Sequence, residues 1–581
     1  MENNTIPEDS GHSNQETASI RILATSDIHG VFYPWKYPTD TEFTTSNLCQ
    51  IASAVREYRN ENTLLVDGGD CIEGNSADLF IHTDEIHPMA AAMNAVGYDI
   101  CITGNHDYDY GLEKVRKFLH ELNADVLTGN VYDAEGTPIA GGCLIRRIGA
   151  VRAAVIGMTT PVIARTHRNI LEGCLVTDPY AETEKILKEI EGKYDVLIGL
   201  FHMGISDEFH IEHSGITQLC EKFPQFDVMI ASHEHKRIEG ILINGVLTVM
   251  NKNDGETMSV IDLSLEKTDG SWTVTEKTSR LIEISTFAPD RDLMRLLKPY
   301  HELAREDMKA TVGKLCGGEL NPEHGQLFLP AIHRMDTPLN TLILNVILHY
   351  TGARVSAAAI ADPGTNVLPG VLSKSDLSRI YKFGNTLTIV RMNGRQLKML
   401  LEKCTGLFNT YHPGDLTLSI QEGTHDYNWY NFKGVCYEIN VSRESGNRIE
   451  HMTFEDGMPI HEDDQFKFAG TNFLCDTMIF NPGAVYEKED MPELIETEAG
   501  GSLGDIRKMI HDYIVRVKKG VLKAEKSDNW KITGTSWDPA KHARAMRLLQ
   551  QGRIPEDYID SNQHLFKAIT EKDLDLFEHM E

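Results

Sequence analysis

The sequence lacks the features that would place it in a membrane. No run of about 20 apolar residues, the length that spans a bilayer as a helix, occurs in the 581 residues. The first 18 residues are polar and acidic, without the basic start and apolar stretch of a secretory signal. These absences lead us to expect a cytoplasmic protein with no membrane partner.

Paired cysteines and positive charge are also scarce. The ten cysteines are scattered and show no CxxC spacing, which favours reduced core thiols over a disulfide framework. Lys and Arg number 56 against 86 Asp and Glu, giving a net charge of −30. Such a field repels nucleic-acid polymers, and it also repels small phosphate esters unless metal ions supply local positive charge.

The order of apolar segments predicts two α/β domains. Between residues 19 and 285, runs such as "SIRILATSD", "ENTLLVDGGD" and "DVLIGLFHMG" alternate with amphipathic stretches, as in α/β layers with buried strands. We expect a polar N-terminal tail at 1–18, a first domain at 19–285, a linker helix at 286–312, a second α/β domain at 313–530 and a polar helical tail at 531–581.

Polar side chains end five of the apolar runs in the first domain. They are Asp27 and His29, Asp70, Asn105 with His106 and Asp109, His202, and finally His233 with His235. In the DxH and HxH pairs, side chains two residues apart lie on the same side of an extended segment and can share a metal. One such pair alone is more typical of a solvated turn, and Asp70 alone could cap a helix. Together, the five elements favour a metal centre.

These motifs, in this order, resemble those of the calcineurin-like metallophosphoesterases, and "GNHDYDYG" resembles their 5'-nucleotidase branch. The resemblance covers residues 19–285 and implies a four-layer α/β/β/α domain with two divalent metal ions. Asp27, His29 and His235 would hold one ion, Asn105, His202 and His233 the other, and Asp70 would bridge them. Imidazole mixed with carboxylate suits Mn, Zn, Fe, Co or Ni, among which the sequence does not choose.

The resemblance also implies the catalytic roles. A hydroxide activated by both ions would attack the phosphorus atom. His106 would stabilise developing charge or protonate the leaving oxygen, and Asp109 would orient His106. Asp107 and Tyr108, in the same stretch, have no catalytic role in this interpretation.

Residues 335–402 resemble the 5'-nucleotidase C-terminal domain, although Asn366 stands where its phosphate loop would place the first arginine. "YNWYNFKGVCYEINV" and "GTNFL" are similar to segments of 2',3'-cyclic-nucleotide 2'-phosphodiesterases. That match implies that Tyr427 and Phe473 clamp a nucleotide base beside Asn472, because base–aromatic stacking tolerates any base. The alternative is that these aromatic side chains belong to a core.

Three functions follow from these patterns. The first is metal-dependent hydrolysis of nucleotide phosphoesters by a 2',3'-cyclic-nucleotide 2'-phosphodiesterase or a 3'- or 5'-nucleotidase, with a small nucleotide as substrate. The second keeps the metal chemistry but acts on a non-nucleotide ester or, as a pyrophosphatase, on a UDP-sugar. The third is a binding protein without catalysis. The sequence leaves the oligomeric state open.

Overall fold

The computed structural model describes residues 16–166, 171, 173–208, 211–323, 328–360, 362–382, 384–500 and 503–578. The chain divides into two compact units, Met1–Glu306 and Asp307–Glu581. The division falls within helix α7 (Arg291–Met308), inside the stretch where the sequence predicts a linker helix. Of the predicted N-terminal tail, residues 1–15 lie outside the described residues, and strand β1 already begins at Thr17.

Two six-stranded sheets form the centre of the first unit. The first sheet has the order β16 (Ser271–Glu283), β15 (Thr257–Thr268), β1 (Thr17–Thr25), β4 (Thr63–Asp67), β5 (Ile100–Ile102) and β6 (Asp125–Leu127). The second has the order β13 (Ile238–Ile243), β14 (Val246–Met250), β12 (Val228–Ala231), β11 (Val196–His202), β9 (Val151–Thr159) and β8 (Cys143–Ile148). Four neighbouring strands of each sheet are parallel. They are β1, β4, β5 and β6 in the first sheet, and β9, β11, β12 and β14 in the second.

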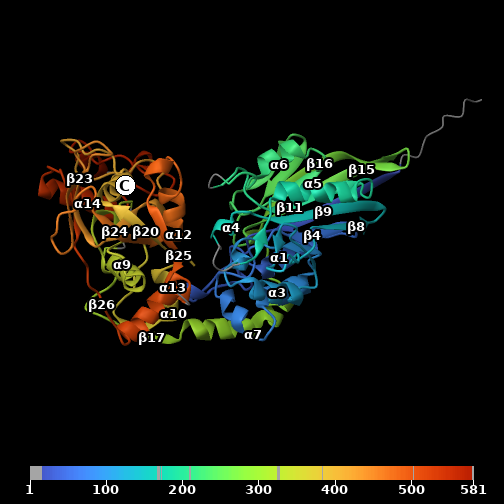
Figure 1. Ribbon diagram of the computed structural model, residues 1–581, viewed down its shortest axis with the longest axis horizontal. Coiled ribbons are helices and arrows are strands. Elements are labelled where there is room, and N and C mark those ends of the chain that lie inside the picture. The colour runs from blue at the N-terminus through green and yellow to red at the C-terminus, as the bar shows by residue number, and fades with distance from the viewer. Residues whose placement is uncertain are drawn as a thin grey trace, which may run out of the picture. The chain divides into compact units, whose positions relative to one another are not determined.

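The two sheets pack face to face. Alternate residues of each strand point into the core between them, as a period of two requires, and include Ile22, Val66, Ile198 and Ile230. Helices α5 (Pro179–Ile190) and α6 (Ile216–Lys222) cover the outer face of the second sheet. Helices α1 (Leu48–Tyr58) and α3 (Leu112–Glu121) lie on the other side, beyond β4 (Figure 1), and α2 (Pro88–Val96) contacts both of them. This arrangement confirms the predicted α/β/β/α layers.

The second unit is built on a five-stranded mixed sheet. Its order is β21 (Tyr430–Lys433), β18 (Val355–Ala359), β24 (Gln465–Thr471), β20 (Leu387–Asn393) and β25 (Glu493–Ala499). Helix α11 (Gly394–Thr405) packs on one face, and α9 (Pro338–Thr351) and α13 (Ile506–Asp512) pack on the other. Two three-stranded sheets complete it: β19 (Gly370–Ser373), β17 (Thr311–Cys316) and β26 (Val521–Lys523), and β23 (Ile449–Phe454), β22 (Val435–Asn440) and β27 (Trp530–Thr533).

The C-terminal segment differs from the predicted helical tail. Strand β27 crosses the expected boundary at residue 530, because it pairs with β22 in the second unit. Beyond it lie α14 (Pro539–Gln550) and the short α15 (Leu574–Glu578), while the described residues between these two helices form neither an α-helix nor a named strand. Their apolar side chains form a hydrophobic cluster with Leu416, here called the tail cluster: Ala545, Leu548, Leu549, Ile554, Leu565, Ile569, Leu574 and Phe577. The segment is therefore packed into the second unit.

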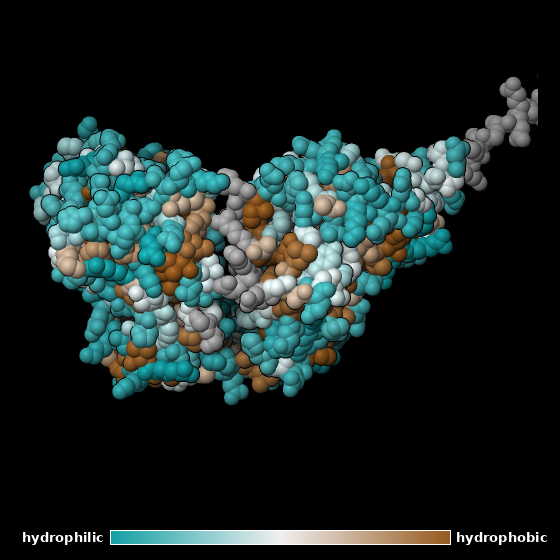
Figure 2. Space-filling model, in the orientation of Figure 1, coloured by the Kyte–Doolittle hydropathy of each residue, from teal (hydrophilic) through white to brown (hydrophobic). Residues whose placement is uncertain are grey.

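On the face that Figure 2 shows, the surface of both units is mostly hydrophilic, with scattered hydrophobic patches. The large exposed apolar side chains come from separate parts of the chain, as with Leu242, Val371 and Leu576. Within the part of the chain that the structure describes, no helix has both the length and the apolar character needed to cross a bilayer.

The tail cluster generates a stability prediction. Leu548 is 3% exposed in it, so Leu548→Ala should lower the opening free energy of α14 by about 2–5 kcal/mol through lost burial and a cavity. Leu576→Ala is the matched control, since Leu576 is 65% exposed and its loss should change this free energy by less than about 0.5 kcal/mol. Hydrogen exchange of the α14 amides measures both. Equal protection in the two variants would contradict the packing described here.

Candidate metal centre

The predicted ligands of the first unit lie in loops that follow five parallel strands. Asp27, Asp70 and Asn105 follow β1, β4 and β5 of the first sheet. His202 ends β11, and His233 follows β12, in the second sheet. Because carboxyl ends of parallel strands meet at one edge of a sheet, and the two sheets pack face to face, the loops converge.

The structure brings Asp27, His29 and His235 together as one group whose ligand atoms lie within 4.8 Å of one another. The Nε2 atoms of His29 and His235 are 3.2 Å apart, and Nε2 of His235 is 3.4 Å from Oδ1 of Asp27. These are the three residues that the resemblance assigns to one ion.

Asp70, His202 and His233 form a second such group. Nε2 of His202 lies 3.2 Å from Oδ2 of Asp70 and 3.0 Å from Oδ1 of Asn105. The same nitrogen is 4.0 Å from Oδ1 of Asp27, so the two groups are neighbours. All seven predicted ligands therefore lie in this one region of the first unit.

The donor atoms are arranged as a cation site requires. Among the described residues, Oδ2 of Asp27 and Oδ2 of Asp70 are buried without a hydrogen-bond partner. Nδ1 of His202 donates to the carbonyl of Gly68 over 2.6 Å, which leaves Nε2, beside the oxygens of Asp70 and Asn105, as the nitrogen that a metal ion would bind. Acceptors that face one another in a dry site need a cation between them, so the residues fit a bound metal ion.

The field at the site also favours cations. Burial lowers the pKa of His29 and His202, but Glu73 beside His29 and Asp70 beside His202 outweigh it and raise each pKa to about 9. Burial raises the pKa of Asp70, yet His202 and the other imidazoles hold it well below its usual value. Protons and metal ions therefore compete for the same nitrogens.

Five of the seven ligands have a left-handed backbone. The φ angles are 53° at Asp27, 48° at His29, 58° at Asp70, 77° at His233 and 55° at His235. Each such residue costs about 1–3 kcal/mol, which the surrounding structure must offset, and strained residues of this kind cluster at functional sites. These residues lie in the short loops at the strand ends, where the ligand groups meet.

Asp107 holds two of the ligand loops together. Its carboxylate accepts hydrogen bonds from the backbone N–H groups of Asp70, Cys71, Ile72 and Gly104, at 3.0, 2.9, 3.2 and 2.8 Å. The family resemblance assigns Asp107 no catalytic role. Its structural role is to fix the loop of Asp70 against the loop of Asn105. The spacing of the motif carries no signal of this bond.

Two glutamates that sequence reasoning missed contact the ligand histidines. Oε2 of Glu208 lies 2.8 Å from Nε2 of His233, and Oε2 of Glu73 lies 3.4 Å from Nδ1 of His29. A carboxylate on one ring nitrogen orients the imidazole and leaves the other nitrogen for a metal. Glu73 stands three residues after Asp70 and Glu208 six after His202, and this closeness to the motifs is the only signal in the sequence.

His106 and Asp109 lie together beside the first group. Nδ1 of His106 is 3.0 Å from Oδ2 of Asp109, and the ring centroids of His106 and His29 are 5.6 Å apart. Burial lowers the pKa of His106, but Asp109 outweighs it and raises that pKa well above its usual value. The imidazole is half-exposed, so it can meet a bound ligand.

The predicted base-binding residues come together within the second unit. Tyr427 and Phe473 have ring centroids 6.0 Å apart, and both are 40% exposed, so neither belongs to a core. Their planes are nearly perpendicular, at 84°, whereas a base held between them needs parallel faces. His425 stacks on Tyr427 at 4.9 Å, and Oδ1 of Asn472 accepts a hydrogen bond from Asn385.

Asn366 takes a structural place. It is 6% exposed, its Oδ1 accepts the N–H of Asn321 over 2.8 Å, and its amide donates to Glu319. The side chain is therefore committed to its own loop and does not stand in for a phosphate-binding arginine.

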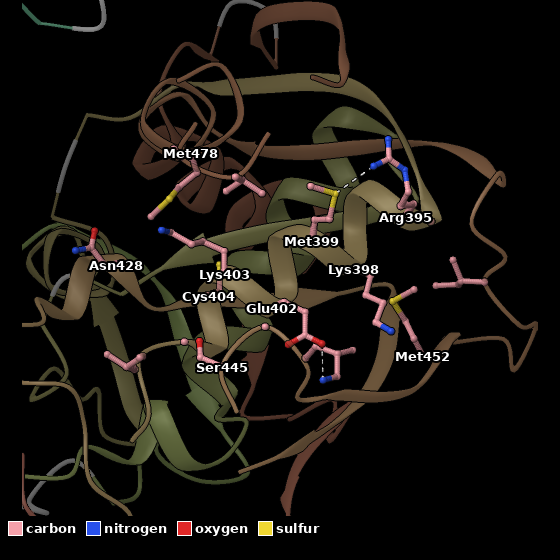
Figure 3. Close-up of a pocket in the computed structure, with 18 of the residues that line it drawn as sticks. Arg395, Lys398, Met399, Glu402, Lys403, Cys404, Asn428, Ser445, Met452 and Met478 are labelled. Carbon is pink, nitrogen blue, oxygen red and sulfur yellow. Dashed lines mark hydrogen bonds between the residues drawn. The ribbon is translucent and has the colours of Figure 1, made fainter. Parts of the chain in front are cut away.

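A cavity of about 960 Å³ lies along α11 in the second unit (Figure 3). Its wall includes Lys398, Met399 and Lys403 from α11, and Asn428 and Met478 from the segments that follow Tyr427 and Phe473. Neither ring is among the described residues that line it. The cavity is therefore distinct from the predicted base site.

Comparison with known proteins identifies both units. Residues 20–237 match the model of the calcineurin-like phosphoesterase family, and residues 324–478 match that of the 5'-nucleotidase C-terminal domain. The first unit therefore belongs to the calcineurin-like phosphoesterase family, and the second carries a 5'-nucleotidase C-terminal domain. The phosphoesterase residues named above all lie within the first match, and Tyr427, Asn472 and Phe473 lie within the second.

Several named proteins are similar to this chain over most of its length. The trifunctional nucleotide phosphoesterase protein YfkN of Bacillus subtilis is 27% identical over 89% of the chain, which spans 39% of that protein's length. The 2',3'-cyclic-nucleotide 2'-phosphodiesterase/3'-nucleotidase of Salmonella typhimurium is 25% identical over 79% of the chain and 82% of its own length. A Staphylococcus aureus 5'-nucleotidase candidate, crystallised with alpha-ketoglutarate, has the same fold: the TM-score is 0.70 at 18% identity, over 89% of this chain and 100% of that one.

The bonds of Asp107 generate a prediction for the metal centre. Asp107→Ala leaves four buried N–H groups without their acceptor, at about 1–3 kcal/mol for each unsatisfied group, and releases the loop of Asp70. We expect a lower melting temperature of the metal-free protein and at least tenfold weaker Mn²⁺ binding by calorimetry, on the order of 1.4 kcal/mol. Asp109→Ala serves as the control, since it should leave Mn²⁺ affinity within about twofold. Equal affinities in the two variants would show that Asp107 does not position Asp70.

Proposed function

We propose that this phosphoesterase hydrolyses nucleotide phosphoesters with two divalent metal ions, with 2',3'-cyclic nucleotides and 3'- or 5'-nucleotides as the substrate class. The observation that carries the proposal is that unpaired oxygens of Asp27 and Asp70 meet the ring nitrogens of the four histidines at one edge of two sheets. The names of similar proteins from Bacillus and Salmonella support the nucleotide part of the proposal.

The two groups of side chains would each hold one ion. Asp27, His29 and His235 would surround the first, His202, His233 and Asn105 the second, and Asp70 lies beside His202 with an oxygen free to contact both. Divalent ions at such a site, when bound, lower the pKa of a water molecule and stabilise charge on the attacking and leaving oxygens. Nitrogen and oxygen donors in this mixture favour Mn, Zn, Fe, Co or Ni.

Proton donation to the substrate would fall to His106, which Asp109 orients. Asp109 holds Nδ1 of His106, so Nε2 is the nitrogen that can donate a proton to a phosphoryl or leaving oxygen. The same contact fixes the direction of the ring. A proton from Nε2 would let the leaving oxygen depart as a neutral hydroxyl.

A second candidate keeps the metal chemistry and changes the substrate to a non-nucleotide ester or a UDP-sugar. Two observations favour it. Asn366 is committed to its own loop where a phosphate-binding arginine would stand, and the rings of Tyr427 and Phe473 are perpendicular instead of parallel. A binding protein without catalysis is the third candidate, although no observation of the site favours it.

A substrate panel distinguishes these functions. We expect 2',3'-cyclic, 3'- and 5'-nucleotides to be hydrolysed faster than UDP-sugars or glycerol phosphate in the presence of Mn²⁺, Co²⁺ or Zn²⁺, and chelation to abolish every activity. A preference for glycerol phosphate or UDP-sugars would support the second candidate. No hydrolysis with any metal, in protein shown to bind the metal, would support the third.

A separate prediction concerns His106. His106→Ala removes the proton donor but no member of either metal group, so kcat should fall by about 10²–10⁴-fold while metal content by mass spectrometry stays at the wild-type value. Loss of the metal together with activity would instead assign His106 to the ligands.

A further inference from the structure

We propose that the turn at residues 560–564, in the C-terminal segment, positions Tyr427 for base binding. The inference rests on the proposed function, because it concerns how the proposed nucleotide base is bound. Residues 560–564 lie outside the parts of the chain that match either family model. It is carried by hydrogen bonds between two turns that lie more than 130 residues apart in the chain.

Four hydrogen bonds join the 560–564 turn to residues 423–426, just before Tyr427. The N–H of Gly423 donates to Oδ2 of Asp560 over 2.9 Å, and Nδ2 of Asn562 donates to the carbonyl of Thr424 over 3.0 Å. His564 makes the other two: Nδ1 lies 3.1 Å from the carbonyl of Thr424, and Nε2 lies 2.9 Å from Oδ1 of Asp426. Tyr427 is the next residue, in the single turn Asp426–Asn428.

The bonds of His564 require a charged ring. A carbonyl and a carboxylate oxygen both accept, so each ring nitrogen of His564 must carry a hydrogen, which only the imidazolium does. The side chain is 3% exposed, and Asp426 is its counter-ion. Burial lowers the pKa of His564, but the bond to Asp426 outweighs it and the pKa is raised. His333, 3.3 Å from the same oxygen, is neutral, since burial lowers its pKa to about 4.

The 560–564 turn is itself fixed. Oδ1 of Asp560 accepts the N–H groups of Asn562 and His564, at 2.9 and 2.8 Å. The next residue, Leu565, is buried in the tail cluster and accepts the N–H of Ile420 through its carbonyl. Because the turn is held in place, its hydrogen bonds fix the position of residues 423–426.

The residues on either side of Tyr427 border the cavity along α11. Thr424 and Asn428 line the cavity along α11, and Figure 3 shows Asn428 at its edge. After Tyr427 the chain is anchored by Trp429, which is 1% exposed and donates from Nε1 to the carbonyl of Ile332. Tyr427 thus lies between two fixed parts of the chain. Trp429 is held in the core after it, and the 560–564 turn fixes residues 423–426 before it.

The test compares KM and kcat for the best nucleotide of the panel in the full chain. His564→Ala should raise KM about tenfold, because a charged hydrogen bond to the turn is lost, while kcat stays within about twofold. Hydrolysis of glycerol phosphate, which has no base, should not change. Asn562→Ala removes one bond to Thr424 without removing a buried charge, and a rise of about threefold in KM keeps the test available if His564→Ala folds poorly.

Two controls separate positioning from general damage. His542→Ala removes a comparable bond in the same segment, from Nδ1 to the carbonyl of Leu416 at 2.7 Å, without a described contact to residues 423–428, and should leave KM unchanged. In a Tyr427→Ala background, His564→Ala should have no further effect on KM, since a positioning residue acts through the ring that it positions.

The outcomes are distinguishable. Equal KM values for His564→Ala, Asn562→Ala and His542→Ala, or a full effect of His564→Ala without Tyr427, would overturn the positioning role while leaving the proposed function intact. If Tyr427→Ala itself leaves the nucleotide KM unchanged, the base site proposed here fails, and the positioning role fails with it.

Discussion

The face-to-face packing of two sheets is the constraint on which the metal centre depends. The first sheet supplies Asp27, His29, Asp70 and Asn105, and the second supplies His202, His233 and His235, so neither sheet alone holds a complete set. The apolar side chains between the sheets are buried, and each contributes about 1.5–3 kcal/mol. Burial on this scale offsets the strain of the five left-handed ligand residues.

The loops around the centre are held by carboxylates that do not themselves belong to it. Asp107 joins the loops of Asp70 and Asn105, Glu208 contacts His233, and Asp109 contacts His106. Each fixes a group that must lie within a fraction of an ångström of its partners. Carboxylates also connect segments in the second unit, where Asp560 and Asp426 join the C-terminal segment to the turn of Tyr427 by hydrogen bonds.

The sequence could predict what depends on short-range pattern. The strand ends and the i and i+2 pairs follow from apolar periodicity and motif order, and the four layers follow from the family resemblance that those motifs carry. The structure places all seven predicted ligands together. It could not predict what depends on distant partners. Three of the four amides that Asp107 binds are 35 to 37 residues away, and the partner of Gly423 is 137 residues away. The predicted helical tail is largely irregular, since its apolar residues pack into a cluster without helical periodicity.

The angle between Tyr427 and Phe473 shows a further limit. Both residues could be selected from their segments, and both are exposed and adjacent, but side-chain rotation decides whether their faces are parallel. The chemistry of the first unit is therefore better specified by the sequence than the substrate of the second.

The most direct test of the account is anomalous diffraction from crystals of the protein grown with Mn²⁺. The account predicts two peaks about 3.5–4 Å apart, with Asp70 between them, one beside Asp27, His29 and His235 and the other beside Asn105, His202 and His233. A single peak, or peaks that leave the Asp27 and Asp70 oxygens without a metal contact, would contradict it.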